Sequence, residues 1–193
     1  MSLIPLRDVS LYVKVIGTGD PIAMMHGGPG LDHSTLLVFR RCADQFKLVF
    51  YDHRCNGRSN GAPVTSMTWE NLTADAEALR EELGFEKWAV LGQSFGGMVA
   101  LEYALRYPGS LSHLLLIDTC GDIRWAQEKA PRALAEQGYS EDTVELASRF
   151  FNGQISPQEM VPAINKFGRA YYHRLSLFKQ ALAMLSGLRM KMN

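Results

Sequence analysis

The chain has 193 residues, of which 47% are hydrophobic and 21% are charged, a composition typical of one soluble globular domain with room for a small subdomain. Lysine and arginine together number 20, as do aspartate and glutamate, so the sequence excludes the overall basic charge that nucleic-acid binding would need. The three cysteines are far apart and odd in number, which argues against a disulfide framework and a metal site, and we expect no cofactor.

The first ten residues, MSLIPLRDVS, place Arg7 and Asp8 where a secretory signal would need an apolar core. No apolar stretch of the sequence is long enough to cross a membrane. We therefore expect a cytoplasmic protein that associates with neither membrane nor nucleic acid.

Apolar runs alternate with helical patterns over the first 120 residues. The runs predicted as strands are residues 11–16, 21–26, 47–52, 88–92 and 111–118. Between them, helices are predicted over residues 36–42, after an N-cap at Thr68, and over residues 95–106. This alternation implies an α/β fold with a mostly parallel sheet and helices on both faces.

The character of the sequence changes after Gly121, because the strand signals end and helical patterns take over. We therefore divide the chain into a core of residues 1–120 and a helical lid or cap of residues 121–193. Residues 156–159 form a capping box with proline at the first helical position. The last helix has a heptad spacing that suits either an ordinary buried face or a dimer seam. Its apolar residues are Tyr171, Leu175, Phe178, Leu182 and Leu185.

Residues 92–96, GQSFG, fit the pattern G-x-S-x-G between a predicted strand and a predicted helix. A serine on so sharp a turn needs strained backbone angles, and small neighbours let the strand and the helix approach closely. The turn raises the Ser94 hydroxyl above the sheet, where the helix N-terminus favours developing negative charge. A glycine-rich turn with an incidental serine is the alternative.

Residues 26–30, HGGPG, follow an earlier strand, and their backbone amides suit a developing oxyanion. The alternative is a plain turn. In either case we expect His26 to play a structural role.

Together the two motifs resemble the α/β-hydrolase fold family, and HGGPG resembles its proline iminopeptidase branch. The segment YDHRCNGRS, residues 51–59, is similar to the family's D-x-R-G-x-G-x-S turn, with Cys55 in place of the first glycine. The resemblance implies that Ser94 is the nucleophile and that the amides of Gly28 and Phe95 form the oxyanion hole. It also implies that the chain ends inside the family's lid, before the strands that usually carry the acid and the histidine.

The remaining residues offer candidates for the missing partners of Ser94. Asp118 is the best acid, because its strand should end at the same sheet edge as Ser94, although a turn or capping role suits it equally well. His113 begins that strand and is excluded, because it lies about 15 Å from the strand's catalytic end. His173 preserves the order serine, acid, histidine and is our first candidate for the base, with His33 and His53 as alternatives.

The leading functional hypothesis is a serine hydrolase of small esters or amides, either esterase-like or proline iminopeptidase-like. In the resembling peptidases, acidic lid residues bind the substrate's free amine. The glutamates available here are Glu128, Glu136, Glu141, Glu145 and Glu159, although solvated helix faces explain them equally well. A non-catalytic truncated relative that serves as a binding or dimerisation module is the alternative, and a fragment is a third possibility. Because the sheet would end on an exposed edge, we also expect a homodimer through the C-terminal helix, with His173 of one copy reaching Ser94 of the other.

Overall fold

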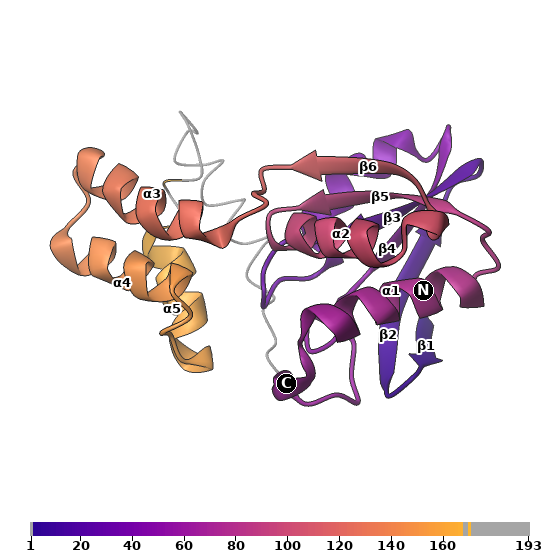
Figure 1. Cartoon of the computed structure of the whole chain (residues 1–193), viewed down its shortest axis with the longest axis horizontal. Coiled ribbons are helices and arrows are strands. Elements are labelled where there is room, and N and C mark those ends of the chain that lie inside the picture. The colour runs from indigo at the N-terminus through magenta and orange to yellow at the C-terminus, as the bar shows by residue number, and fades with distance from the viewer. Residues whose placement is uncertain (1, 168–169, 171–193) are drawn as a thin grey trace. The chain divides into compact units, whose positions relative to one another are not determined.

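The computed structural model describes residues 2–167 and residue 170, and these form two compact units (Figure 1). The first unit runs to Thr119 and holds all six strands that the structure describes. The second begins at Cys120 and is helical over its described residues. None of the described helices is long and apolar enough to cross a membrane.

The first unit is built on one sheet in the order β1-β2-β4-β3-β5-β6. Its strands are β1 (Ser2–Leu6), β2 (Val9–Ile16), β3 (Asp20–Met25), β4 (Phe46–Tyr51), β5 (Trp88–Gln93) and β6 (Leu111–Ile117). The pairs from β4 through β3 and β5 to β6 are parallel, whereas β1, β2 and β4 pair antiparallel. The predicted α/β class with a mostly parallel sheet is therefore confirmed.

Helices cover the two faces of the sheet unequally. On one face lie α1 (Trp69–Glu82) and α2 (Phe95–Arg106), and on the other lies the 3₁₀ helix η1 (His33–Cys42) (Figure 1). The alternation of β4 shows how the sequence produces this layering, because Val49 and Tyr51 pack in the α1–α2 core while Leu48 and Phe50 pack in the η1 core. Two short 3₁₀ turns, η2 (Val64–Ser66) and η3 (Pro108–Ser110), complete this unit.

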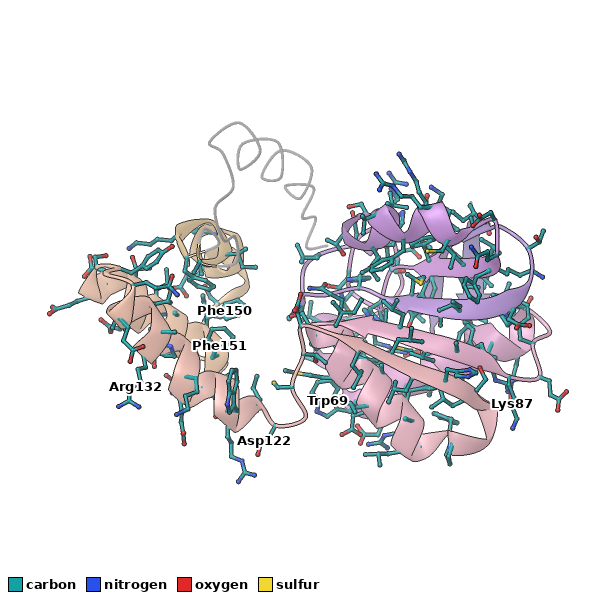
Figure 2. The ribbon with its side chains drawn as sticks, turned by 90° about the horizontal axis from the view of Figure 1, so that it is seen from above. Trp69, Lys87, Asp122, Arg132, Phe150 and Phe151 are labelled. Atoms are coloured by element: carbon teal, nitrogen blue, oxygen red, sulfur yellow. The ribbon has the colours of Figure 1, made fainter. Side chains whose placement is uncertain are left out.

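The second unit contains α3 (Ile123–Glu136), α4 (Glu141–Phe151) and α5 (Pro157–Phe167). Its core is a small apolar cluster around Leu134, Ala147 and Phe167. Phe150 (Figure 2) stands edge-on to Phe167, with 5.3 Å between ring centroids. This aromatic contact joins α4 to α5.

The structure differs from the sequence-based expectations at the N-terminus. No strand was expected before residue 11, yet β1 pairs with β2 through a tight turn at Arg7, whose φ is 54°. A helix was expected from residue 36, and the 3₁₀ helix η1 already begins at His33 because Asp32 accepts a hydrogen bond from the Ser34 N–H at 2.8 Å. The prediction of a heptad-spaced final helix concerns residues 171–185, which lie outside the described residues.

Candidate active site

Ser94 lies at the junction of β5 and α2 in a strained backbone conformation, with φ 53° and ψ −120°. It occupies the N-cap position of α2, yet within the described chain its side chain makes no capping hydrogen bond. Its carbonyl oxygen accepts a hydrogen bond from the Thr119 hydroxyl at 2.7 Å, and its N–H donates to the Ile117 carbonyl at 3.0 Å. These bonds hold the backbone in place while the hydroxyl is not used in local structure, as expected of a nucleophile on a sharp turn.

Glycine is required at Gly96 because the first turn of α2 lies directly on the end of β3. A Cβ at Gly96 would overlap the carbonyl oxygens of Met25 and His26. A Cβ at Gly92, the other glycine of the motif, would likewise overlap the backbone of α2. The motif thus brings strand, serine and helix together at a distance that no larger residue allows.

The glycine-rich loop of residues 26–30 lies against this turn. Met25 is in register with Gly92, and Gly27 packs on Gln93, the residue before Ser94. Gly28 has φ 144°, a conformation that favours glycine. The structure therefore places both predicted motifs side by side at the carboxyl ends of β3 and β5.

His26 joins this loop to the turn after β4. Its Nδ1–H donates to the Gly27 carbonyl oxygen at 2.6 Å, and its Nε2 accepts from the backbone N–H of His53 at 3.1 Å. This pair of bonds requires the neutral ring, and burial lowers the pKa of His26 accordingly. The predicted structural role thus agrees with the contacts of His26.

The turn after β4 is organised around Asp52, which is fully buried. Its carboxylate accepts hydrogen bonds from the backbone N–H groups of His33 and Arg58 and from the His33 ring at 2.7 Å. Burial acts to raise the pKa of Asp52, and these hydrogen bonds outweigh it and lower the pKa. Asp32, His33 and Asp52 offer possible metal ligands within 4.8 Å of one another, but the hydrogen bonds to Asp52 account for this cluster without an ion.

Cys55 has φ 62°, in the left-handed region that favours glycine, at the position where the resembling family has glycine. We expect Cys55→Gly to raise the free energy of unfolding by about 0.5–1 kcal/mol, because it relieves strain that exceeds the entropy cost of glycine. Urea unfolding measures this change. Cys55→Ala is the matched control, since it keeps the Cβ, and an equal gain in that variant would contradict the explanation by strain.

His53 is buried at the centre of an aromatic stack. Its ring centroid lies 4.5 Å from that of His26, 5.1 Å from that of Tyr51 and 6.0 Å from that of Phe95. Among the described residues neither ring nitrogen has a hydrogen-bond partner. Burial, with a smaller contribution from His26, therefore sets the pKa of His53 well below its ordinary value.

Stability should consequently depend on pH between 7 and 5. The folded protein keeps His53 neutral, whereas the unfolded chain binds a proton near pH 6.5, so stability is complete above that pH and falls below it. We expect His53 to account for a loss of about 2 kcal/mol between pH 7 and pH 5. Urea unfolding at both pH values should show a smaller loss in His53→Phe, and an unchanged loss in the exposed control His113→Gln. The same loss in His53→Phe as in the wild type would refute this assignment.

The predicted acid and bases lie in different surroundings. Asp118 follows β6 with φ 44° and has an exposed side chain. Of the four histidines that the structure describes, one pairs with a carboxylate, namely His33 with Asp52. The contact of His33 Nδ1 with Asp52 is the kind of carboxylate pairing that a catalytic histidine uses, whereas the burial of His53 counts against that alternative base. His173, the first candidate, lies outside the described residues.

One of the lid glutamates is engaged within its own helix terminus. Glu159 accepts hydrogen bonds from the backbone N–H and the hydroxyl of Ser156, and it pairs with Arg149 at 2.8 Å. These contacts lower the pKa of Glu159 to about 2. Its carboxylate thus serves as a helix cap.

Sequence reasoning missed two residues that support the site. Asn56 accepts a hydrogen bond from the Gly30 N–H and donates to the Arg54 carbonyl at 2.7 Å, so it fixes the glycine-rich loop. The position of Asn56 inside the D-x-R-G-x-G-x-S motif was the feature of the sequence that could have indicated this role. Thr119, which bonds to Ser94, had no signal in the sequence because its role depends on the pairing of β5 with β6.

Known proteins resemble the chain in sequence and in structure. A proline iminopeptidase of Xylella fastidiosa (strain 9a5c) is 36% identical over 121 residues, which cover 61% of this chain and 39% of the relative. A probable proline iminopeptidase of Streptomyces coelicolor is 42% identical over 106 residues, which cover 51% of this chain and 32% of the relative. The crystal structure of a proline iminopeptidase from Mycobacterium smegmatis matches with a TM-score of 0.70 and 25% identity, covering 96% of this chain and 67% of the other.

The chain spans about two fifths of the length of the Xylella relative, so the match concerns part of that protein. The family model described as alpha/beta hydrolase fold matches residues 20–161, which include both glycine-rich motifs and Ser94. The chain therefore belongs to the alpha/beta hydrolase fold family, as its motifs predicted.

Proposed function

We propose that the chain acts as a serine hydrolase on small ester or amide substrates, with Ser94 as the nucleophile. The observation that carries this proposal is the strained backbone of Ser94 at the N-terminus of α2, together with a side chain that caps nothing within the described chain. Strain of this kind costs on the order of 1–3 kcal/mol and is concentrated at functional sites.

In the proposed reaction, the Ser94 oxygen attacks the substrate carbonyl carbon while a histidine takes the hydroxyl proton. The N–H groups of Gly28 and Phe95 stabilise the oxyanion that forms, aided by the N-terminus of α2. The histidine then gives its proton to the leaving alcohol or amine as the carbonyl bond to that group breaks. Water hydrolyses the resulting acyl-enzyme and restores the Ser94 hydroxyl.

For the proton transfer we keep His173 as the proposed base and Asp118 as the proposed acid. The burial of the His53 ring in an aromatic stack counts against His53 as the base, whereas His33, which pairs with Asp52, stays an alternative base. The curated relatives suggest a proline iminopeptidase-like substrate, and an esterase substrate fits the same chemistry.

The proposed homodimer has one supporting observation in the first unit. The edge strand β6 carries Leu115 and Leu116, which are 40% and 43% exposed, and a second copy that covers them would protect this edge. Size-exclusion chromatography with light scattering tests this proposal, and a stable, well-folded monomer would refute it.

Activity should be measured on 4-nitrophenyl acetate and on L-proline 4-nitroanilide. We expect Ser94→Ala to reduce hydrolysis by about 10³-fold or more, while Ser112→Ala, a change at an exposed serine of β6, leaves it unchanged. Turnover of the anilide would favour the peptidase, and turnover of the ester alone would favour the esterase. Equal hydrolysis by Ser94→Ala and the wild type would contradict the proposal, and a folded protein that turns over neither substrate would favour the non-catalytic binding module.

A further inference from the structure

A pocket of about 270 Å³ opens beside the N-terminus of α1 in the first unit. Its walls are formed by Met67, Thr68, Trp69, Glu70, Leu72 and Phe95. The volume accommodates a single ring-sized group. Four of these side chains are apolar, and two of them are aromatic.

The pocket lies at the same sheet edge as Ser94. In the chain α1 follows β4 and α2 follows β5, so the N-termini of both helices lie at the carboxyl ends of parallel strands, where ligands bind in open α/β sheets. Figure 2 agrees, because it shows Trp69 at the end of the first unit opposite to Lys87, the residue that precedes β5. Phe95, which lines the pocket, is also the residue whose N–H is the proposed oxyanion donor.

The two aromatic walls of the pocket pack against each other. The rings of Trp69 and Phe95 are 5.7 Å apart and inclined by 33°, and Trp69 remains 39% exposed at the surface. His53 contacts the Phe95 ring edge-on, with 6.0 Å between the ring centroids. A bound ring would therefore cover exposed tryptophan surface and contact a fixed phenylalanine.

Two polar residues line the pocket, and each has a partner elsewhere in the first unit. Glu70 forms an ion pair with Arg106 at 2.9 Å, and the Thr68 hydroxyl accepts the capping hydrogen bond from the Asn71 N–H. Among the described lining residues the one charged group is therefore the Glu70 carboxylate, and Arg106 partly neutralises it. The surroundings of the pocket favour an uncharged occupant.

We propose that this pocket binds an uncharged aromatic or similarly flat apolar ring of the substrate and positions its carbonyl group at Ser94. The identification of the ring as part of a substrate rests on the proposed function, whereas the binding of the ring does not. Trp69 and Phe95 are then residues that determine specificity.

The test is an NMR titration with two probes that share a phenyl ring, neutral 2-phenylacetamide and cationic 2-phenylethylammonium. The indole N–H of Trp69 and the backbone N–H of Phe95 report binding, in the wild type and in Ser94→Ala. We expect saturable shifts at both signals with phenylacetamide, weaker binding of the cation, and the same affinity in Ser94→Ala. Trp69→Ala, followed at Phe95, should weaken binding by about two- to tenfold, because it removes one aromatic contact.

Leu105→Ala is the matched control, since it removes a 78% exposed apolar side chain near the other end of α2. If Trp69→Ala does not fold, Trp69→Leu tests the aromatic contact instead. The proposal is overturned if neither signal saturates, if the cation binds more tightly, or if Leu105→Ala weakens binding equally. If the protein binds phenylacetamide but hydrolyses neither substrate, the proposed function is refuted and the assignment of the pocket stands. If the protein is active but does not bind phenylacetamide, the assignment of the pocket is refuted and the proposed function stands.

Discussion

Asp75→Ala is expected to lower the free energy of unfolding by about 3–5 kcal/mol. Asp75 accepts two hydrogen bonds from the Arg54 guanidinium, at 2.6 and 2.7 Å, and a third from Arg7. The side chain of Arg54 is fully buried and that of Asp75 is 2% exposed. Removal of the carboxylate leaves a buried guanidinium without its main partner, which is more costly than the loss of an exposed ion pair.

Asp8→Ala provides the matched control for this prediction. Asp8 also pairs with Arg54, at 2.9 Å, but its side chain is 59% exposed, so water replaces much of the interaction. Urea unfolding should show a much smaller change for Asp8→Ala than for Asp75→Ala. Similar losses in the two variants would mean that burial of the pair does not determine its contribution.

Gly96→Ala is expected to destabilise the protein by about 1–3 kcal/mol and to displace the turn that carries Ser94. The added methyl group would overlap the carbonyl oxygens of Met25 and His26, and backbone atoms cannot move aside as a flexible side chain can. Because these carbonyls begin the glycine-rich loop, the same displacement separates the proposed oxyanion donors from the nucleophile. Unfolding in urea measures the first effect, and the hydrolysis rate measures the second.

Gly109→Ala is the appropriate comparison, because a Cβ there meets nothing within 4 Å and φ lies outside the left-handed region. This substitution should leave both stability and hydrolysis nearly unchanged. If Gly96→Ala behaves like Gly109→Ala, the close approach of α2 to β3 does not hold the site together.

The turn at Ser94 could be predicted because its signals are local. GQSFG lies between an apolar run and a helical pattern, and the structure begins and ends α2 at the predicted residues, Phe95 and Arg106. The cap at Thr68 is equally local, since the Thr68 hydroxyl accepts a hydrogen bond from the N–H three residues later. Short-range steric and hydrogen-bonding requirements are readable in one stretch of sequence.

Features that depend on tertiary contacts could not be predicted in this way. β1 was missed because residues 2–6 alternate only weakly and become a strand by pairing with β2. The ion pair of Arg54 with Asp75 joins residues 21 positions apart, and the contact of Trp69 with Phe95 joins two different helices. His33 was considered as a base because of its position after HGGPG, and only the fold reveals its contact with Asp52.

Labelling with a fluorophosphonate, read by intact mass, tests most directly whether Ser94 is an activated nucleophile. We predict a single adduct on the wild type that is absent from Ser94→Ala and present on Ser112→Ala, with folding of each protein confirmed by circular dichroism. An adduct that persists in Ser94→Ala, or a folded wild type that takes no label, would contradict the assignment of Ser94 as the catalytic nucleophile of this chain.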